Sequence, residues 1–513
     1  MTTSPFKPEE RAFAELITGL CYSNPFSKQR VDLEKRALGD RYCAVSDAWS
    51  LGPGHRNKNL SPLTEQTRAL LLSSHKRITA ATSTTDRQLF GGLLRFWLFY
   101  RFNDELLTLA GHSIRPGFKD QKVALYAKFG AALAEFHPGC DVGLPAPAHL
   151  FALLFQLRRA FERIHQTIIG ASGPARTLRA RLWQSVFSHD MRRYERTLYD
   201  RMHEMPTLIL GPSGTGKELA ARAIGMSRYL PFNEKSECFV EEVADSFQAL
   251  NIAALAPELL ESELFGHSKG AFTGATSDRV GWLEGCPDHG TIFLDEIGEL
   301  DGTIQIKLLR TLQTRELQRV GESKSRPFLG KVISATNRNL DEAIANGTFR
   351  QDFYYRLCAD IVQTPQLAAQ LKDRPADLEM LVTHVAGRLV NGDEVAAVTD
   401  QVCSFIRKKL GMDYPWPGNI RELEQCVRNM LIQGEYTPQA LALGGEGDPG
   451  HGTASKLSRA FLAGEISADE LLDTYTSWVF QKTQSYSETG RKLGLDRRTV
   501  KSRVNPALLR RFK

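Results

Sequence analysis

The stretch Gly211-Pro-Ser-Gly-Thr-Gly-Lys217 decides the fold class of this chain. It follows Thr207–Leu210, a short apolar run typical of a buried strand, and precedes the helical run Glu218–Met226. In a G-x-x-x-x-G-K pattern the glycines let backbone N–H groups wrap around phosphates, while the helix N-terminus and the lysine add positive potential. A chance glycine-rich turn is the alternative, and the flanking strand and helix argue against it. The predicted phosphate-binding loop comprises Gly211, Pro212, Ser213, Gly214, Thr215, Gly216, Lys217 and Glu218.

Two carboxylates form a second candidate group. The apolar run Thr291–Leu294 ends in Asp295 and Glu296. At the end of a buried strand beside a phosphate loop, Asp295 can hold Mg²⁺ and Glu296 can orient or deprotonate an attacking water. Taken alone, such a pair would more often be exposed acids, but the phosphate loop upstream favours the catalytic interpretation. Glu218 stands where a Mg²⁺-binding serine or threonine is usual, so the metal would rely more on Asp295, water and the nucleotide.

The pattern along the chain predicts several segments. Up to about Arg201 it is mostly helical, whereas short apolar runs then alternate with helices, as in a parallel α/β sheet. After about Leu357 we expect the strands to disappear and helices to continue to roughly Gln433. Residues 444–453 contain five glycines and a proline, which indicates a linker. Beyond it, Ser467 and Glu470 read as a capping box that opens a helix, and a short basic helical pair follows.

Length and composition set broad limits. At about 100–200 residues per domain, 513 residues predict about three domains. Apolar residues make up 42% and charged residues 24%, which is typical of globular proteins. No run reaches the roughly 20 apolar residues of a membrane span, and no secretory signal is visible, so we expect a cytoplasmic protein without membrane contact. The eight cysteines are scattered without a CxxC pair, which argues against a zinc ribbon or disulfide framework.

Positive charge is concentrated at the C-terminal end. The net charge is +6, yet residues 481–513 hold 10 lysines and arginines against 2 acidic residues. Lysine and arginine neutralise phosphates and release counterions. A folded basic segment of this kind indicates contact with a polyanion.

The hexapeptide Gly270-Ala271-Phe272-Thr273-Gly274-Ala275 lies between the two candidate groups. Its glycines bracket a tip with one aromatic ring and one hydroxyl, a composition that suits a mobile contact loop, although a structural turn is the alternative. The sequence resembles the GAFTGA loop of the bacterial enhancer-binding proteins, the NtrC-like AAA+ activators of sigma-54 RNA polymerase. The resemblance implies that these six residues contact sigma-54.

Further motifs resemble the same family in order. Asn251 resembles the asparagine that senses the γ-phosphate and restrains the catalytic glutamate, and Thr336 and Asn337 resemble sensor I. Arg350 and Arg356 resemble arginine fingers supplied to a neighbouring subunit, although for either one alone a surface salt bridge would be the commoner role. Arg421 resembles sensor II on the helical lid. The stretch that begins at Pro365 lacks the usual Pro-Leu-Arg-Glu-Arg run, and Leu230–Gln248 is longer than the common spacing.

The basic C-terminal pair, with a turn at Gly494, resembles the Fis-like helix-turn-helix of this family. A solvated helical hairpin is the alternative. Groove and phosphate contacts are expected on or near its second helix. The candidate DNA-binding residues are Arg497, Arg498, Thr499, Lys501, Ser502 and Arg503.

The N-terminal part carries no comparable motif. It lacks the α/β pattern and early acidic residues of a phosphoacceptor receiver, and its histidines are not at metal-ligand spacing. One aromatic group could line a ligand pocket, although such clusters are more often core. That group is Phe96, Trp97, Phe99, Tyr100 and Phe102.

The resemblance implies an α/β AAA+ core, a parallel sheet with a helical lid, between a mostly helical N-terminal domain and an all-α helix-turn-helix. The expected boundaries are 1–176 for a regulatory domain, 177–357 for the α/β subdomain, 358–440 for the lid, 441–455 for the linker and 456–513 for the DNA-binding domain. The implied protein is a hexameric ATPase that uses ATP and Mg²⁺, binds double-stranded enhancer DNA and remodels the closed complex of sigma-54 RNA polymerase holoenzyme. Two alternatives remain: an AAA+ remodeller or loader of another class with a DNA tether, and a repressor whose ATPase has decayed.

Overall fold

The computed structural model describes residues 4–44, 58–438 and 467–505 and divides into two units, residues 1–428 and residues 429–513. The predicted linker, residues 441–455, lies entirely outside the described residues. In the described residues no helix is both long enough and apolar enough to span a membrane.

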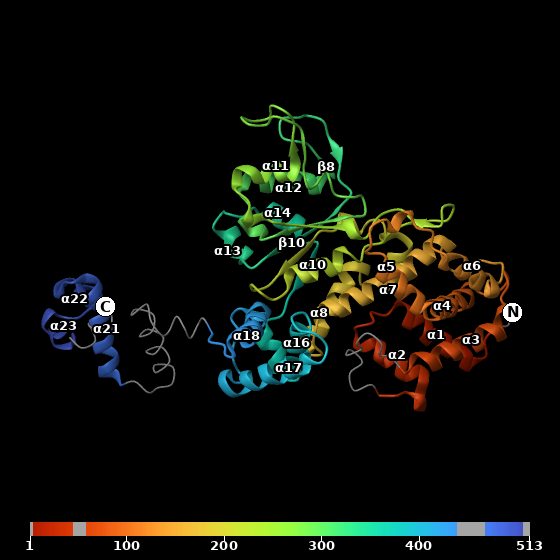
Figure 1. Ribbon diagram of the computed structural model, residues 1–513, viewed down its shortest axis with the longest axis horizontal. Coiled ribbons are helices and arrows are strands. Elements are labelled where there is room, and N and C mark those ends of the chain that lie inside the picture. The colour runs from red at the N-terminus through yellow and green to blue at the C-terminus, as the bar shows by residue number, and fades with distance from the viewer. Residues whose placement is uncertain (1–3, 45–57, 439–466, 506–513) are drawn as a thin grey trace. The chain divides into compact units, whose positions relative to one another are not determined.

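The N-terminal part of the first unit is helical, as predicted (Figure 1). α1 and α3 pack on α4, and α5 packs on α7. The approach of α1 to α4 is close because Gly92 has no side chain: a Cβ there would lie 2.3 Å from Thr18 Oγ1. The helices are α1 (Pro8–Tyr22), α2 (Lys28–Leu38), α3 (Leu60–Ser74), α4 (Thr84–Arg101), α5 (Asn103–His112), α6 (Leu125–Phe136), α7 (Pro147–Thr167), α8 (Gly173–Phe187) and α9 (Met191–Arg193).

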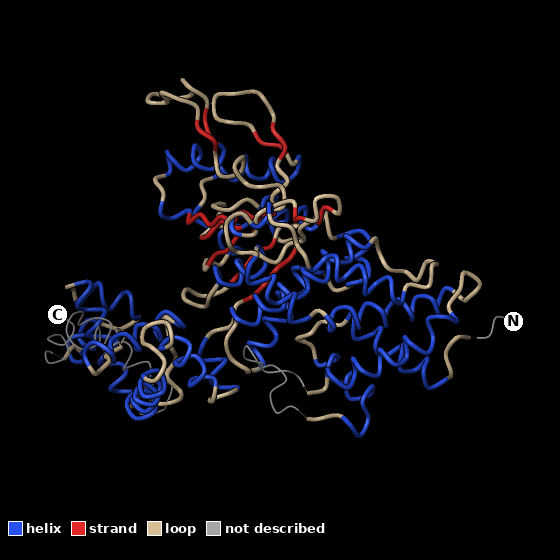
Figure 2. The backbone as a smooth tube through the Cα atoms, turned by 45° about the vertical axis from the view of Figure 1, so that its right-hand side comes forward, coloured by secondary structure: helices blue, strands red, loops and turns tan. Residues whose placement is uncertain are grey.

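A five-stranded parallel sheet forms the centre of the unit, with strand order β11-β1-β10-β7-β4 (Figure 2). Its strands are β1 (Thr207–Leu210), β4 (Phe247–Asn251), β7 (Thr291–Asp295), β10 (Lys331–Thr336) and β11 (Asp360–Gln363). The three central strands coincide with the predicted apolar runs, so the predicted α/β fold is confirmed. The expectation that strands end near Leu357 is wrong, because β11 pairs with β1 and extends the α/β part to Gln363.

Helices and short ribbons complete the α/β part. The helices are α10 (Lys217–Gly225), α11 (Pro257–Phe265), α12 (Gly302–Thr314), α13 (Leu340–Ala345) and α14 (Gln351–Leu357). Three two-stranded ribbons pair β2 (Phe232–Asn233) with β3 (Cys238–Phe239), β5 (Gly266–His267) with β6 (Arg279–Val280), and β8 (Glu316–Leu317) with β9 (Arg326–Pro327). The β5–β6 ribbon frames residues 270–275.

The predicted all-helical lid follows the sheet. Its helices are α15 (Leu367–Asp373), α16 (Asp377–Ala386), α17 (Glu394–Phe405) and α18 (Asn419–Gln433). α16 packs along α17.

The N-terminal helices share one apolar core with the α/β part. The long stretch Leu230–Gln248 holds the β2–β3 ribbon, whose Phe239 ring lies 4.5 Å from Phe155 of α7. α7 and α8 also pack on α10. The predicted boundary at residue 176 falls inside α8, so it does not separate two folded parts. The physical reason is that α8 is one continuous helix whose apolar face is buried in this shared core.

The described C-terminal helices of the second unit are α21 (Ala468–Thr483), α22 (Tyr486–Leu493) and α23 (Arg497–Arg503). Ser467 caps α21 by accepting the Glu470 N–H at 3.3 Å, as predicted. Between α22 and α23, Gly494 adopts φ 67°, a left-handed conformation that glycine tolerates at a helix end. The predicted helix, turn and helix are therefore present.

Candidate active site

The phosphate-binding loop lies between β1 and α10 and is built for close backbone approach. Gly214 (φ 76°) and Gly216 (φ 89°) are left-handed, and a Cβ on Gly214 would lie 2.2 Å from the Gly418 carbonyl oxygen of the lid. Lys217 turns its Nζ onto the loop, donating to the carbonyl oxygens of Gly211 at 3.0 Å and Pro212 at 3.4 Å. Burial lowers the Lys217 pKa, and the charges of Asp295 and Glu296 oppose that shift. The negative charge of a bound phosphate would likewise oppose the lowering of the Lys217 pKa.

The carboxylate pair lies at the end of β7. Burial, and secondly the charge of Glu296, raise the Asp295 pKa above its usual value. Glu296 itself is left-handed, with φ 56°. Its Oε2 accepts the Asn337 N–H at 3.2 Å and the Thr336 hydroxyl at 3.5 Å. The structure thus brings the predicted glutamate together with both predicted sensor I residues.

The remaining strand ends meet at the same edge of the sheet. Asn251, at the end of β4, is paired in register with Asp295 of β7, and Leu210 of β1 is paired with Thr336 of β10. Carboxyl ends of parallel strands are where ligands bind in open α/β sheets. Candidate site residues that are far apart in the sequence therefore lie at the same edge of the sheet, where the phosphate-binding loop also lies.

The lid reaches the phosphate-binding loop through the start of α18. Arg421 Nη1 donates to Ser213 Oγ at 3.0 Å, so the predicted sensor II residue contacts the loop. Asn419 was not predicted, although it lies in the sensor II stretch. Its Nδ2 donates to the Ser213 carbonyl at 3.0 Å, while its Oδ1 accepts the Leu367 N–H at 3.0 Å. Asn419 (φ 52°) therefore ties the loop to α15 and α18 at once.

Glu218, the departure from the usual pattern, is exposed on α10 and forms a 3.3 Å ion pair with Arg222 one turn on. It provides no hydroxyl for a metal.

The two candidate arginine fingers lie on or beside α14. Arg350 is exposed and paired with Asp352 at 2.7 Å, and half-buried Arg356 donates to the Leu312 carbonyl at 3.0 and 2.5 Å. Among the described residues, neither guanidinium makes a hydrogen bond or ion pair with residues 211–218. The single chain therefore does not bring these arginines to its own phosphate-binding loop.

The loop at residues 270–275 projects between β5 and β6. Gly270 and Gly274 are left-handed, and a Cβ on either would meet only open space. The Phe272 side chain is 43% exposed, with its ring 5.0 Å from the His267 ring. Thr273 is exposed as well. The loop thus presents an apolar ring and a hydroxyl to the surroundings.

The C-terminal candidates divide into two groups. Arg497, Arg498, Lys501 and Ser502 are exposed on α23. Thr499 donates to the capping residue Asp496, and Arg503 forms ion pairs with Asp469 at 3.0 Å and Asp473 at 2.9 Å of α21. The structure therefore gives Thr499 and Arg503 contacts inside the domain and leaves the other four open to solvent.

Comparison with known proteins places this geometry in a family. Residues 186–362 match the Sigma-54 interaction domain, and residues 372–440 match the AAA+ ATPase lid domain. The sigma54-dependent transcriptional activator SfnR of Pseudomonas putida is 39% identical over 318 residues, which cover 59% of this chain and 81% of SfnR. This chain belongs to the sigma-54-dependent transcriptional activators.

Other members of the family match over a smaller share of their length. The Nif-specific regulatory protein of Azotobacter vinelandii is 38% identical over 58% of this chain and 53% of its own length. The transcriptional regulatory protein ZraR of Klebsiella oxytoca is 38% identical over 58% of this chain and 62% of its own length. Among solved structures, NtrX from Brucella abortus in complex with ATP is 22% identical, with a TM-score of 0.40, covering 75% of this chain and 81% of that chain.

Membership in the sigma-54-dependent activators confirms the predicted family, the activator function and the AAA+ ATPase. The match to the Sigma-54 interaction domain supports sigma-54 as the partner. It does not support an AAA+ remodeller or loader of another class.

Proposed function

We propose that this activator binds upstream enhancer DNA through α22 and α23, assembles into a hexameric ring in the cytoplasm, and presses residues 270–275 onto sigma-54 when ATP is hydrolysed between subunits. The N-terminal helices would regulate the ring. The observation that carries the hydrolysis step is the placement of Glu296 beside the phosphate-binding loop, with its carboxylate held by residues 336 and 337.

The site fits a magnesium nucleotide. The loop from Gly211 to Lys217 offers backbone N–H groups and an ammonium group to phosphates. Burial, and secondly the charge of the adjoining Glu296, raise the Asp295 pKa, and a divalent cation there would favour the ionised carboxylate. Asp295 would hold Mg²⁺ together with nucleotide oxygens and water, because Glu218 supplies no hydroxyl. The metal would neutralise charge on the phosphate oxygens.

Glu296 would position the attacking water. Its backbone lies in the left-handed region, a conformation that costs about 1–3 kcal/mol in a residue other than glycine and that often marks a functional site. Thr336 and Asn337 fix one carboxylate oxygen, and Asn251 would sense the γ-phosphate from the neighbouring strand end. Arg421 contacts Ser213 of the phosphate-binding loop, so it would respond to nucleotide bound at that loop.

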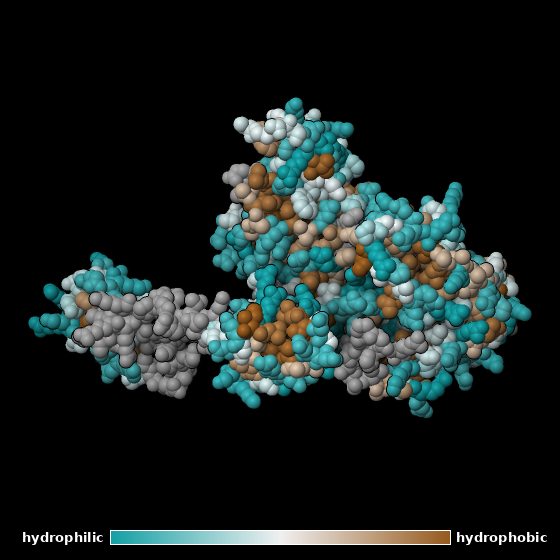
Figure 3. Space-filling model, in the orientation of Figure 1, coloured by the Kyte–Doolittle hydropathy of each residue, from teal (hydrophilic) through white to brown (hydrophobic). Residues whose placement is uncertain are grey.

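Exposed apolar side chains support assembly into a ring. Leu259 of α11 is 52% exposed and Ile306 of α12 is 50% exposed. Figure 3 shows apolar surface over α11 and α12 on the α/β part. A contiguous apolar surface on a soluble protein marks an interaction site. In a head-to-tail ring, Arg350 and Arg356 would reach the nucleotide of the next subunit.

Mixed rings test whether the arginines act between subunits. We expect Arg356→Ala and Glu296→Gln rings each to hydrolyse ATP poorly, because an arginine finger is worth about 10³–10⁵ in rate. In an equal mixture, about a quarter of head-to-tail interfaces would carry both intact groups, so phosphate release should partly recover. Arg407→Ala, an exposed arginine between α17 and α18, is the control and should stay active. No recovery in demonstrably mixed rings would favour a structural role for Arg356.

DNA binding is assigned to the exposed basic side chains of α23. Deleting residues 467–513 removes α21 to α23 together, so it should abolish footprinting at the cognate site and leave ATP hydrolysis. If Arg498 contacts a base edge, Arg498→Ala should weaken the free energy of DNA binding by about 1–3 kcal/mol. If it contacts a phosphate, the slope of log affinity against log salt concentration should become shallower by about one. Lys482→Ala is the control, because the Lys482 ammonium group lies over the Trp478 ring of the same helix, α21. This variant should bind DNA as wild type does. Unchanged footprinting after the deletion would move DNA binding to residues 1–176, which are also basic, with 23 lysines and arginines against 15 acidic residues.

A further inference from the structure

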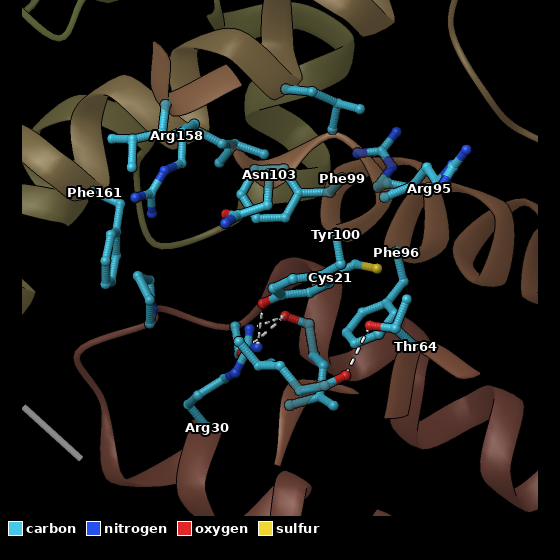
Figure 4. A pocket seen from close by; sticks show the side chains of 18 of the residues that line it. Cys21, Arg30, Thr64, Arg95, Phe96, Phe99, Tyr100, Asn103, Arg158 and Phe161 are labelled. Atoms are coloured by element: carbon cyan, nitrogen blue, oxygen red, sulfur yellow. Dashed lines mark hydrogen bonds between the residues drawn. The ribbon is translucent and has the colours of Figure 1, made fainter. Parts of the chain in front are cut away.

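The N-terminal helices enclose a cavity of about 690 Å³. It lies among α1, α2, α3, α4, α5, α7 and α8, apart from the nucleotide site, and Figure 4 shows it from close by. Sites for small organic molecules usually have about 300–1,000 Å³. Of the aromatic group singled out in the sequence, Phe96, Phe99 and Tyr100 line the cavity, whereas Trp97 and Phe102 are buried in the core.

Aromatic rings form much of the wall. Besides the three from α4, the cavity is lined by Phe26, Phe161 and Trp183. Phe26 stacks on Phe161 at 5.2 Å and meets Trp183 edge-on at 6.1 Å. Aromatic pairs of this kind add to the energy of burial and favour a flat aromatic guest.

Two of the arginines at the cavity already have partners. Arg30 donates to Glu34 at 2.8 Å, to the Leu20 carbonyl at 3.0 Å and to the Tyr100 hydroxyl at 2.7 Å. Arg95 forms a two-pronged ion pair with Glu195. These two guanidinium groups hold the helices together.

Arg158 of α7 differs from them. Its Nη2 donates to Glu162 at 3.0 Å, whereas its Nη1 is accessible and, among the described residues, has no hydrogen-bond partner; its Nε is buried without a partner, as is the Nε of Arg95. Figure 4 shows the Arg158 side chain entering the cavity between Phe161 and Asn103. Burial lowers the Arg158 pKa, so an anion in the cavity would stabilise its charged form. The accessible Nη1 is the donor that an anionic ligand in the cavity can reach, and a charge-assisted hydrogen bond of this kind is stronger than a neutral one.

We propose that this cavity binds a small aromatic organic anion, with its ring among Phe99, Tyr100 and Phe161 and its carboxylate or sulfonate group on Arg158. A single negative charge fits, because the Nη groups of Arg30 and Arg95 already have partners, and Arg158 keeps one accessible donor, Nη1. The fourth arginine at the cavity, Arg101, is exposed. A polyanion such as a nucleotide is disfavoured by the carboxylates of Glu65 and Asp104, which also line the cavity.

Helix α7 connects the cavity with the nucleotide site. Leu157, Arg158 and Phe161 line the cavity, whereas other positions of α7 contact the segment just after α10. Gln156 Nε2 donates to the Ser227 carbonyl at 2.9 Å, and Arg159 donates to the Arg228 carbonyl. Since α10 begins with Lys217, a ligand that shifts α7 would shift the phosphate-binding loop. This inference goes beyond the proposed function, and its binding test does not depend on ATP hydrolysis.

Binding can be measured on the full-length protein with anilinonaphthalene sulfonate (ANS), an aromatic anion whose fluorescence rises in apolar surroundings. We expect saturable binding that Arg158→Gln weakens about 10- to 100-fold, as for a charge-assisted hydrogen bond, and that Arg158→Lys weakens less. Leu157→Trp should occupy the part of the cavity beside Arg158 and weaken this binding. Arg115→Gln, an exposed arginine outside the cavity, is the matched control and should bind as wild type. Thermal unfolding of each variant reports whether it is folded.

Two results would overturn the site: no saturable ANS binding by the wild type, or binding that Arg158→Gln and Leu157→Trp leave unchanged while both stay folded. The link to the nucleotide site is tested in a separate experiment. Calorimetry measures the affinity of the Glu296→Gln protein for ATP with and without ANS. Saturating ANS should change that affinity at least about twofold, and at the same ANS concentration the change should be smaller with Leu157→Trp. An affinity unaffected by bound ANS would refute the link through α7.

Discussion

Glu296→Gln is expected to bind ATP and to release almost no phosphate. The amide keeps the size of the carboxylate, and its oxygen can still accept the Asn337 N–H that now holds Glu296 at 3.2 Å. It cannot take a proton from water, and a positioned general base contributes about 10²–10⁴ in rate. Steady-state phosphate release should fall by at least about 100-fold, while the affinity for ATP, measured by calorimetry, should stay within a few fold of wild type.

Two variants separate water activation from nucleotide binding. Lys217→Ala should lose ATP binding itself, because Lys217 supplies the ammonium group of the phosphate-binding loop. Glu299→Gln lies in the same segment, and its carboxylate is exposed and paired with Arg338, so it should hydrolyse ATP as wild type does. Near wild-type phosphate release by Glu296→Gln would mean that this carboxylate does not position water.

The sheet shows which strands sequence patterns can predict. β1, β7 and β10 have a neighbour on each side, and their residues are almost all buried, so they read as continuous apolar runs. β4 and β11 lie at the two edges, and each mixes buried with exposed or half-buried positions. Their apolar signal is short and interrupted. The α/β part therefore extended past the predicted boundary at 357.

The positions of the candidate site could be predicted where chemistry dictates residue type. Glycines and a lysine at fixed spacing identify the phosphate-binding loop, and two acids after a strand identify the end of β7. Asn419 could not be assigned in this way, because its role depends on a left-handed backbone and on contacts with Ser213 and Leu367, which the chain brings together only on folding.

The cavity could not be predicted from a sequence pattern. Aromatic residues at helical spacing indicate burial, and Trp97 and Phe102 follow that rule. Whether neighbouring rings close on one another or leave a space depends on how α4 and α7 pack. The buried, unpartnered Nε of Arg158 is likewise a property of the packing, because the sequence shows only an arginine with an acid four residues on.

Phe272→Ala and Thr273→Ala are expected to keep ATP hydrolysis and to lose open-complex formation. Both side chains are exposed at the tip of the β5–β6 loop, and the Phe272 ring contacts the His267 ring rather than the phosphate site. Removing them should therefore leave phosphate release within about twofold of wild type, whereas truncating an anchor at an interface costs about 2–4 kcal/mol.

Promoter melting at a sigma-54 promoter measures that loss, and open complexes should fall about 30-fold or more at limiting activator. The matched controls lie just outside the hexapeptide: Thr276→Ala for the hydroxyl, and Val280→Ala for an apolar side chain that is 57% exposed on β6. Both should hydrolyse ATP and open the promoter. A loop variant that lost ATP hydrolysis as well would indicate a structural role for the tip. Normal opening by both loop variants would show that the glycine-bounded tip is not the surface that meets sigma-54, and it would direct attention to the neighbouring β8–β9 ribbon.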